Sequence, residues 1–179
     1  MDILPVLSIG SLVVVCAPHA ARDQISALTA NLALRGSVTV LDFGNRFRPY
    51  DVASALRQYT HEVNRYASRI FIRRAFTCYQ VSALLENTPA LRQPYIILDL
   101  LMTFDDENVN LQNARQLLNN CLLQIERLRQ QAPVVLTLNQ PSRSPERACL
   151  FELVCKQADR IFQQEDVIDA VYQPQLFQP

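Results

Sequence analysis

Short apolar runs that alternate with amphipathic segments are the feature that most limits how this chain can fold. The first run, Leu12 to Cys16, is continuous and rich in valine, which is typical of a strand buried on both faces. Further strands are expected at residues 37–43, 68–73, 95–100, 133–138 and 159–162, the last as an edge strand. Helices are expected at residues 21–34, 50–63, 78–87 and 111–131, and residues 147–157 are compatible with a helix or partly with a strand. This alternation predicts an α/β fold with a mainly parallel central sheet and right-handed crossovers.

Length and composition favour one globular domain. We place it at residues 1–163 and expect residues 164–179 to form a loosely held C-terminal tail. Apolar residues make up 49% of the chain and charged residues 19%, a balance typical of globular proteins. The longest apolar runs are too short to span a bilayer, and Asp2 stands where a secretion signal would be basic. We therefore expect a cytoplasmic protein without membrane contact.

The cysteines and histidines do not have the spacing of a metal site. The five cysteines include no C-x-x-C pair, and the two histidines, His19 and His61, lie far apart in the sequence. We expect no metal centre, and free thiols in a reducing compartment. Cys16 and His19 are three residues apart, as a nucleophile and its base could be, but no third orienting group is recognisable. We therefore favour a buried and inert Cys16.

The basic residues are strongly biased, because Lys156 is the one lysine among seventeen basic side chains and the rest are arginine. The formal net charge is zero, so no global field draws the protein toward nucleic acid or membrane. Arginine is better suited than lysine to bidentate pairing with carboxylates and phosphates and to buried ion pairs. The bias indicates such contacts or, equally, the base composition of the source genome.

The turn between the first strand and the first helix, CAPHAARD at residues 16–23, contains neither glycine nor lysine. In α/β nucleotide-binding proteins this turn is a glycine-rich loop of the form G-x-x-x-x-G-K-[ST]. Its glycines let backbone N–H groups approach the phosphates, and its lysine and hydroxyl serve phosphate and magnesium. Here alanine, arginine and aspartate side chains stand at those places. The turn therefore predicts a nucleotide-binding scaffold that has lost its nucleotide chemistry.

Five segments follow one another at sensible spacing between residues 11 and 162. They are CAPHAARDQ, which ends in Gln24; LDFGNRFRPYDV, with Asp42 and Phe47-Arg48-Pro49; RIFIRRAFTCYQVSALLEN, with Arg74-Ala75-Phe76; YIILDL, with Asp99; and PVVLTLNQP, with Asn139-Gln140. In this order they resemble five segments of the RecA/RadA recombinase ATPase core. Those segments are its phosphate loop ending in G-K-T-Q, its D-T-E-G-T-F-R-P-E-R segment, its A-R-A-F-N-like stretch, its second phosphate-site motif and its strand ending in Asn-Gln.

The resemblance implies a three-layer α/β/α RecA-like P-loop NTPase fold with a degenerate phosphate loop. It also shows what is missing, because Arg22 aligns with the family's phosphate-binding lysine and Asp23 with its magnesium-binding threonine. Gly44 aligns with the catalytic glutamate that positions the attacking water. Phosphoryl transfer depends on positioning and charge stabilisation, so loss of these groups predicts loss of ATPase activity. We expect no cofactor, and ATP with magnesium is the disfavoured alternative.

The function implied by the resemblance is that of a non-catalytic recombinase paralog. We expect an accessory or structural subunit in DNA recombination or repair, which acts through a protein partner or as a homo-oligomer and lies in the cytoplasm, nucleoid or nucleus. The loop at residues 104–107 is acidic and would repel DNA, and the loop after residue 140 looks shortened. The family's N-terminal DNA-binding domain and its polymerisation linker have no counterpart, so we expect the core alone.

Six residues form the degenerate nucleotide site on this interpretation: Arg22, Asp23, Gln24, Asp99, Asn139 and Gln140. Asp99 is expected to have a structural role as a turn or capping acid, with magnesium binding through water as the alternative. Asn139 and Gln140 could sense a phosphate or simply hydrogen-bond to neighbouring strand ends. An alternative function is therefore an ATPase or sensor in which Arg22 contacts phosphate and Asp99 or Asp23 holds the metal.

A second set of basic residues, Arg46, Arg48, Arg73 and Arg74, falls at or near strand ends. With Phe47, Tyr50 and Phe76 they could form a basic surface interleaved with aromatic rings that binds single-stranded DNA. The competing interpretation is a solvated face with aromatic residues in the core. The polar face of the helix at residues 111–131 likewise fits either a protein interface or a solvent-exposed surface.

Overall fold

The computed structural model describes residues 3–17, 21–139, 144 and 146–163. Its helices and strands, in chain order, are η1 (Leu4–Val6), β1 (Leu12–Cys16), α1 (Arg22–Arg35), β2 (Val38–Asp42), α2 (Pro49–Arg57), α3 (Val63–Ala67), β3 (Ile70–Arg74), α4 (Cys78–Glu86), β4 (Tyr95–Leu98), η3 (Met102–Phe104), α5 (Leu111–Arg129), β5 (Val134–Leu138), α6 (Ala148–Cys155) and β6 (Arg160–Gln163). The expected tail at residues 164–179 lies outside the described residues, as do His19 and Gln140.

The six strands form one sheet in the order β3-β2-β4-β5-β1-β6, and every pair of neighbours is parallel. The α/β class and the parallel sheet expected from the sequence are therefore confirmed. The four inner strands, β1, β2, β4 and β5, are mostly apolar because they are covered on both faces and buried along nearly their whole length.

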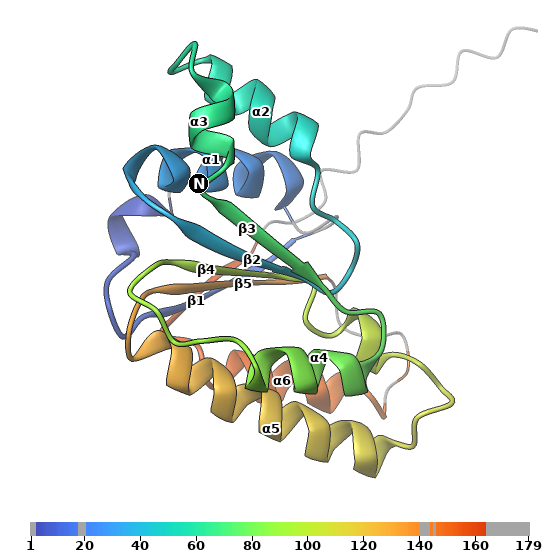
Figure 1. Ribbon diagram of the computed structural model, residues 1–179. Coiled ribbons are helices and arrows are strands. Elements are labelled where there is room, and N and C mark those ends of the chain that lie inside the picture. Colours follow the sequence, from blue (N-terminus) through green and yellow to red (C-terminus); the bar gives the residue numbers. More distant parts are fainter. Residues whose placement is uncertain (1–2, 18–20, 140–143, 145, 164–179) are drawn as a thin grey trace, which may run out of the picture.

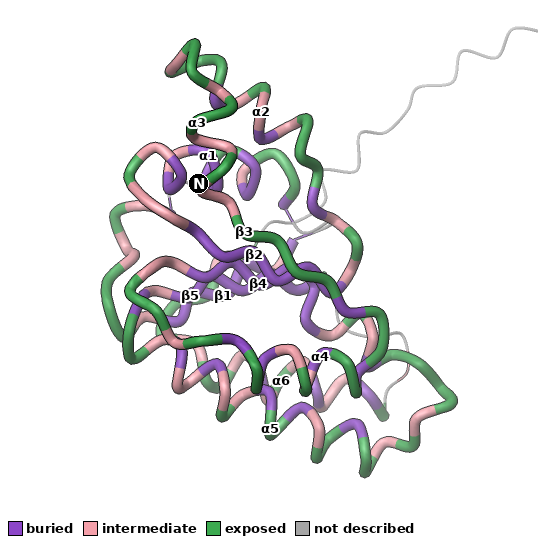
Figure 2. Tube along the Cα trace, in the orientation of Figure 1, coloured by how far each residue is buried: buried purple, intermediate pink, exposed green. Residues whose placement is uncertain are grey.

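Helices cover both faces of the sheet (Figure 1). The chain runs from β1 to β2 and β3 in one direction along the sheet, and from β3 through β4 and β5 to β6 in the other. Right-handed crossovers then place α1, α2 and α3 on one face and α4, α5 and α6 on the other. Figure 2 shows the buried strands between these two layers of helices.

The two faces of the sheet have separate cores. Under α1, the side chains of Ile25, Leu28 and Leu32 pack with Val13 and Val40. On the other face, α5 buries a stripe at helical spacing formed by Ala114, Leu118, Cys121, Ile125 and Leu128. The side chain of Asn110 caps this helix by accepting a hydrogen bond from the backbone N–H of Asn113, 2.9 Å away. The stripe explains why the longest helix lies along the sheet.

The helix expected at residues 50–63 is confirmed at its start, since α2 begins at Pro49, but it ends six residues earlier than expected. The buried positions of α2 end at Leu56, and α2 itself ends at Arg57. The backbone then turns, and the hydroxyl of Thr60 accepts a hydrogen bond from the N–H of Glu62 at 3.0 Å. Serine and threonine offer the backbone such local bonds in place of helical ones. The short helix α3 begins only after this turn.

The strand expected at residues 95–100 is two residues shorter in the structure, because β4 ends at Leu98. Asp99 has a φ of 51°, in the left-handed region that cannot continue a strand. A smaller difference affects β3, which begins at Ile70 rather than residue 68, because Ser68 forms the C-cap of α3. Residues 147–157, left open between helix and strand, contain the helix α6.

None of the described helices combines the length and the apolar character needed to cross a membrane.

Candidate functional site

The candidate site lies at the carboxyl ends of the central strands. β2 and β4 are neighbours, yet the chain leaves β2 toward α2 on one face and leaves β4 toward α5 on the other. A second divergence of this kind separates β1 from β5. In open parallel sheets, ligands bind in crevices at such points, where the connections diverge. The loops after β1, β2 and β4 therefore define where a ligand would bind.

These loops contain the unusual backbone of the molecule. Among the described residues, the non-glycine residues with positive φ are Ala21, Asn45 and Asp99. Ala21 precedes α1, Asn45 follows β2 and Asp99 follows β4. Left-handed conformations in non-glycine residues are concentrated at functional sites, because surrounding contacts must maintain them. The three residues mark this end of the sheet as the part of the fold whose shape depends on tertiary contacts.

The residues at the start of α1 that the structure describes are Ala21, Arg22, Asp23 and Gln24, because residues 18–20 of the preceding turn lie outside the described part of the chain. Ala21 is the N-cap of α1, and its side chain forms no capping hydrogen bond. Arg22 and Asp23 follow it and are both exposed. The carboxylate of Asp23 lies in the first helical turn, where a negative charge interacts favourably with the helix dipole. Gln24 is half-buried, and its Oε1 atom is buried without a hydrogen-bond partner in the described part of the chain.

Asp99 is the best-defined polar residue of the site. Its side chain is only 1% exposed, and its Oδ2 atom accepts a hydrogen bond from Nε of Arg46 at 3.0 Å. Its backbone N–H donates to the hydroxyl of Thr137 on β5 at 2.9 Å. Burial raises the pKa of Asp99 above its ordinary value, although the bond from Arg46 opposes this shift. The Oδ1 atom has no partner among the residues that the structure describes.

Asp42, at the end of β2, organises the loop that carries Arg46. Its Oδ1 atom accepts the backbone N–H of Arg46 at 2.8 Å, and its Oδ2 atom accepts the backbone N–H of Phe47 at 3.1 Å. Nε of Arg74 on β3 also donates to Oδ2 at 3.1 Å. The side chain of Asp42 is fully buried and Arg74 is partly exposed. One buried carboxylate therefore ties together the carboxyl ends of β2 and β3.

Gly44 completes the contact between the loops after β2 and β4. A Cβ atom at position 44 would be 2.6 Å from Cβ of Asp99 and 2.7 Å from its Oδ2 atom. The side chain of Asp99 thus occupies the space in which a side chain at position 44 would begin. In the resemblance described above, position 44 is that of a catalytic glutamate.

The structure brings together residues that the sequence assigned to two different sites. Arg22, from the nucleotide set, and Arg46 and Arg48, from the DNA set, line one small cavity beside Phe47 and Leu98. Its volume is about 10 Å³, room for about one water molecule. Ligand pockets are usually in the range of roughly 300–1,000 Å³. The cavity is therefore too small for a nucleotide base or a phosphate group.

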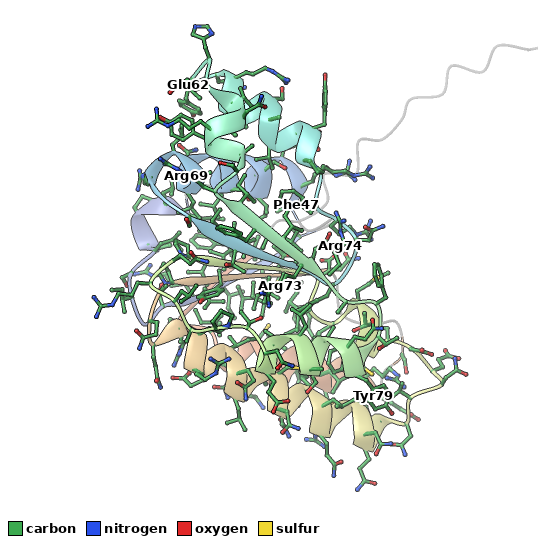
Figure 3. The ribbon with its side chains drawn as sticks, in the orientation of Figure 1. Phe47, Glu62, Arg69, Arg73, Arg74 and Tyr79 are labelled. Atoms are coloured by element: carbon green, nitrogen blue, oxygen red, sulfur yellow. The ribbon has the colours of Figure 1, made fainter. Side chains whose placement is uncertain are left out.

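The basic surface expected from the sequence is only partly formed. Arg46 and Arg74 pair with buried carboxylates, whereas Arg48 and Arg73 are exposed. Of the three aromatic residues considered for this surface, Phe47 instead belongs to the core under α1, because it is only 7% exposed, whereas Tyr50 and Phe76 are exposed. The backbone N–H bond to Asp42 pulls the loop inward and accounts for this burial. Figure 3 shows Phe47 and Arg74 at the same end of the sheet.

The other residues considered from the sequence are Asn139 and the possible metal ligands. Asn139 is exposed immediately after β5. The described residues contain no group of three or more histidine, cysteine, aspartate or glutamate side chains arranged to hold a metal ion. A magnesium ion at Asp99 would compete with the guanidinium of Arg46 for the same carboxylate.

Burial raises the pKa of Cys16 to about 12, and the neighbouring thiol of Cys155 adds to the shift. A thiol with such a pKa is a poor nucleophile at neutral pH.

Sequence reasoning did not identify the second acid, Asp42, or the hydroxyl of Thr137 as parts of the site. Asp42 ends the strand VTVLD and Thr137 lies within the strand VVLTL, and both strands are otherwise apolar apart from Thr39. A polar side chain within a strand buried on both faces must find a hydrogen-bond partner. That pattern was the available signal.

No protein-family model matches this chain, and a search of the curated proteins finds no match either. The fold is that of an α/β protein with an all-parallel six-stranded sheet.

Proposed function

We propose that this chain is a RecA-like domain without ATPase activity, which serves as an accessory or structural subunit in DNA recombination or repair. The proposal is supported by five ordered sequence segments and by the α/β fold with its parallel sheet. The strand ends that carry Asp42, Asp99 and Asn139 belong to adjacent strands. On this proposal, the protein acts by contacting other protein chains.

The observation that carries the proposal is the contact between Gly44 and Asp99. A glutamate at position 44 would require its Cβ atom to lie 2.6 Å from Cβ of Asp99. The acid of β4 is itself neutralised by Arg46 at 3.0 Å. Packing of this kind removes the water-positioning group and ties up the metal-binding one, and phosphoryl transfer needs both. The scaffold remains while the catalytic positions are used for internal contacts.

Calorimetry tests the proposed loss of nucleotide binding. Titration of the full chain with ATP and magnesium to millimolar concentration is expected to give no binding heat, and no phosphate release should be detectable. Two variants, Arg22→Ala and Asp99→Asn, serve as comparisons. Measurable binding that both variants weaken would contradict the proposal and favour the ATPase or sensor alternative.

Complementation in the native host tests the role in DNA repair. Loss of the gene is expected to sensitise cells to DNA damage, and a copy carrying Arg22→Ala should restore resistance as well as the wild type does. The reason is that a structural subunit does not depend on the side chain that replaces the phosphate-binding lysine. Normal damage resistance in the deletion strain would contradict the proposed role.

Direct DNA binding is a weaker candidate, because two of its four arginines neutralise buried carboxylates. The exposed pair, Arg48 and Arg73, leaves few phosphate contacts. Single-stranded DNA should therefore bind weakly, with a shallow dependence on salt. Tight binding that falls steeply with salt and is lost in Arg48→Ala would favour this alternative instead.

A further inference from the structure

An aromatic face at the amino end of α4 is not used by the site described above. Phe76 is 66% exposed and Tyr79 is 55% exposed, and Figure 3 shows Tyr79 at the end of α4 that is next to the loop before α5. Met102, in η3, adds a third exposed apolar side chain, and η3 packs against α4. Exposed apolar side chains that gather in one place mark interaction sites.

Three carboxylates lie beside this aromatic face. Asp105, Asp106 and Glu107 follow η3 and are all exposed. None of them forms an ion pair with another residue in the part of the chain that the structure describes. Burial raises the pKa of Cys78, the first residue of α4, and the negative charge of Asp106 adds to that shift, so this carboxylate lies close to the aromatic residues. The acidic aromatic surface consists of Phe76, Tyr79, Met102 and residues 105–107.

The loop that carries these carboxylates is held in place from inside the molecule. Phe104, at its start, is fully buried in the core. The buried side chain of Arg147 donates hydrogen bonds to the carbonyl oxygens of Phe104 and Val109. The backbone N–H of Val109 also donates to the carbonyl oxygen of Asp106 at 3.1 Å. A partner that binds this loop therefore finds it already ordered, which lowers the entropic cost of binding.

We propose that the acidic aromatic surface binds an arginine-rich segment of a partner protein, in which apolar residues separate the arginines. The three carboxylates pair with guanidinium groups, which match a carboxylate in planar, bidentate geometry. The rings of Phe76 and Tyr79 attract the same cations through their faces. The apolar residues of the segment cover Met102 and the remaining ring surface.

Charge complementarity selects this occupant. Nucleic acids and anionic lipids present phosphates, which the carboxylates would repel. A purely apolar partner would bury the carboxylates without counter-charges, which costs free energy. Among the described residues, Arg73 is an exposed cation on the neighbouring strand β3, but it lines the groove beside Pro89 and Leu91 and forms no ion pair with the loop. The charges of the loop are therefore left for a cationic segment from outside.

This inference rests on the proposed function and deepens it, because it names the surface used for protein contact and the chemistry of the partner. Binding of a basic segment does not depend on the state of the nucleotide site. Titration with a peptide and calorimetry with ATP can therefore fail independently.

Fluorescence anisotropy with labelled model peptides tests the charge of the partner. The probe is a short peptide of repeated Arg-Ala-Leu triplets, and two comparison peptides carry Gln or Glu at every Arg position. The Arg peptide should bind the full chain with a dissociation constant of about 1–100 µM, and the Gln peptide should bind about tenfold more weakly or worse. The Glu peptide should not bind. Binding of the Arg peptide should weaken as salt is added, because exposed charges are screened.

Variants of the full chain locate the surface. Glu107→Lys should weaken binding of the Arg peptide about fivefold or more, and Tyr79→Ala about threefold or more. Glu86→Lys makes the same charge change at an exposed position at the other end of α4, and Tyr59→Ala removes an exposed ring that follows α2. These two control variants should bind the Arg peptide as the wild type does.

Several results would overturn the proposal. They are no binding of the Arg peptide, equal binding of the Gln peptide, equal effects of Glu107→Lys and Glu86→Lys, and a Tyr79→Ala variant that binds as well as the wild type. Sedimentation velocity without peptide tests whether a second copy occupies the surface instead. Self-association that Glu107→Lys abolishes would identify another copy as the occupant and would also overturn the proposal.

Discussion

Gly44 and Asp99 lie in different loops, yet the Cα atom of Gly44 packs so closely on Asp99 that a Cβ atom there would be 2.6 Å from the Asp99 Cβ atom. A side chain at position 44 would therefore overlap that of Asp99, which gives a local steric reason for a glycine there. The same aspartate accepts a hydrogen bond from the guanidinium of Arg46, which lies in the loop that contains Gly44. The close approach of Gly44 and the bond from Arg46 are therefore two parts of one packing arrangement around Asp99.

Gly44→Ala should lower the free energy of unfolding by about 1–3 kcal/mol, because the added methyl group overlaps Asp99. In a protein that already carries Asp99→Gly, Gly44→Ala should lower the free energy of unfolding clearly less, because the opposing side chain is absent. Glycine also tolerates the φ of 51° at position 99. Denaturant unfolding of the four proteins gives the coupling energy. Gly36→Ala is the control, because nothing lies within 4 Å of a Cβ atom there. Equal costs in both backgrounds would refute the steric explanation.

Asp99→Asn should change how stability depends on pH in the acid range. The native pKa of Asp99 is raised above its ordinary value of 3.8, mainly by burial. Between these two values the native state holds the proton more tightly than the unfolded state does. The stabilisation that comes from protonating Asp99 in the native state is thus fully present below pH 3.8, and it is lost as the pH rises through the raised pKa.

The stability of the Asp99→Asn variant does not fall in this way, because asparagine does not titrate. Asparagine also adopts the left-handed backbone conformation readily. The variant's free energy of unfolding relative to the wild type should therefore increase with pH in this window and then level off. Urea unfolding at a series of pH values measures the difference. A difference that decreases with rising pH would mean that the pairing with Arg46 outweighs burial.

Arg127→Met should destabilise the protein by about 1.5–3 kcal/mol, because it removes a charged donor from partly buried carbonyls. Nη2 of Arg127 donates to the backbone oxygens of Leu85 and Thr88, at 3.2 and 2.7 Å, where α4 ends. Methionine keeps the apolar stem but supplies no donor. Arg115→Met, at an exposed position on the same helix, should change stability little. Thermal unfolding of both variants provides the comparison, and equal losses would argue against a specific cap.

Cys16 should react slowly with iodoacetamide in the native protein at pH 8. Burial raises its pKa from 9.0 to about 12, and Cys155 adds to the shift. The thiolate fraction is then lower than that of an ordinary cysteine by about a thousandfold. Mass spectrometry of native protein and of protein unfolded in guanidinium measures the protection. Rapid native labelling of Cys16 would revive the hypothesis that it is a nucleophile.

The arginine bias has a structural use in this fold. Arg69 donates to the carbonyls of Ala33 and Leu34 at the end of α1, and Arg127 does the same at the end of α4. Arg147 is buried and donates to the carbonyls of Phe104 and Val109, which orders the loop before α5. One guanidinium can serve several acceptors in fixed geometry, which an ammonium group cannot match. These contacts connect segments distant in the sequence.

The sequence by itself determined the elements whose pattern is local. Strands buried on both faces are apolar throughout, so Leu12–Cys16 and Val134–Leu138 were predictable, and the stripe of α5 follows from its 3.6-residue period. The break between α2 and α3 was missed, because a short turn held by Thr60 leaves little mark on that period. The absence of glycine and lysine from the loop after β1 was also visible without a structure.

Only the tertiary structure decided what the polar residues do. Arg46 and Asp99 are 53 positions apart, and Asp42 and Arg74 are 32 apart, so no local pattern could pair them. The order of strands in the sheet brings these loops together. It also leaves β3 at an edge, which exposes Phe71 and Ile72 although their segment reads as an ordinary strand. Local periodicity specifies which face of an element is buried, whereas the contacts that neutralise a carboxylate or leave an edge open depend on how distant elements are placed.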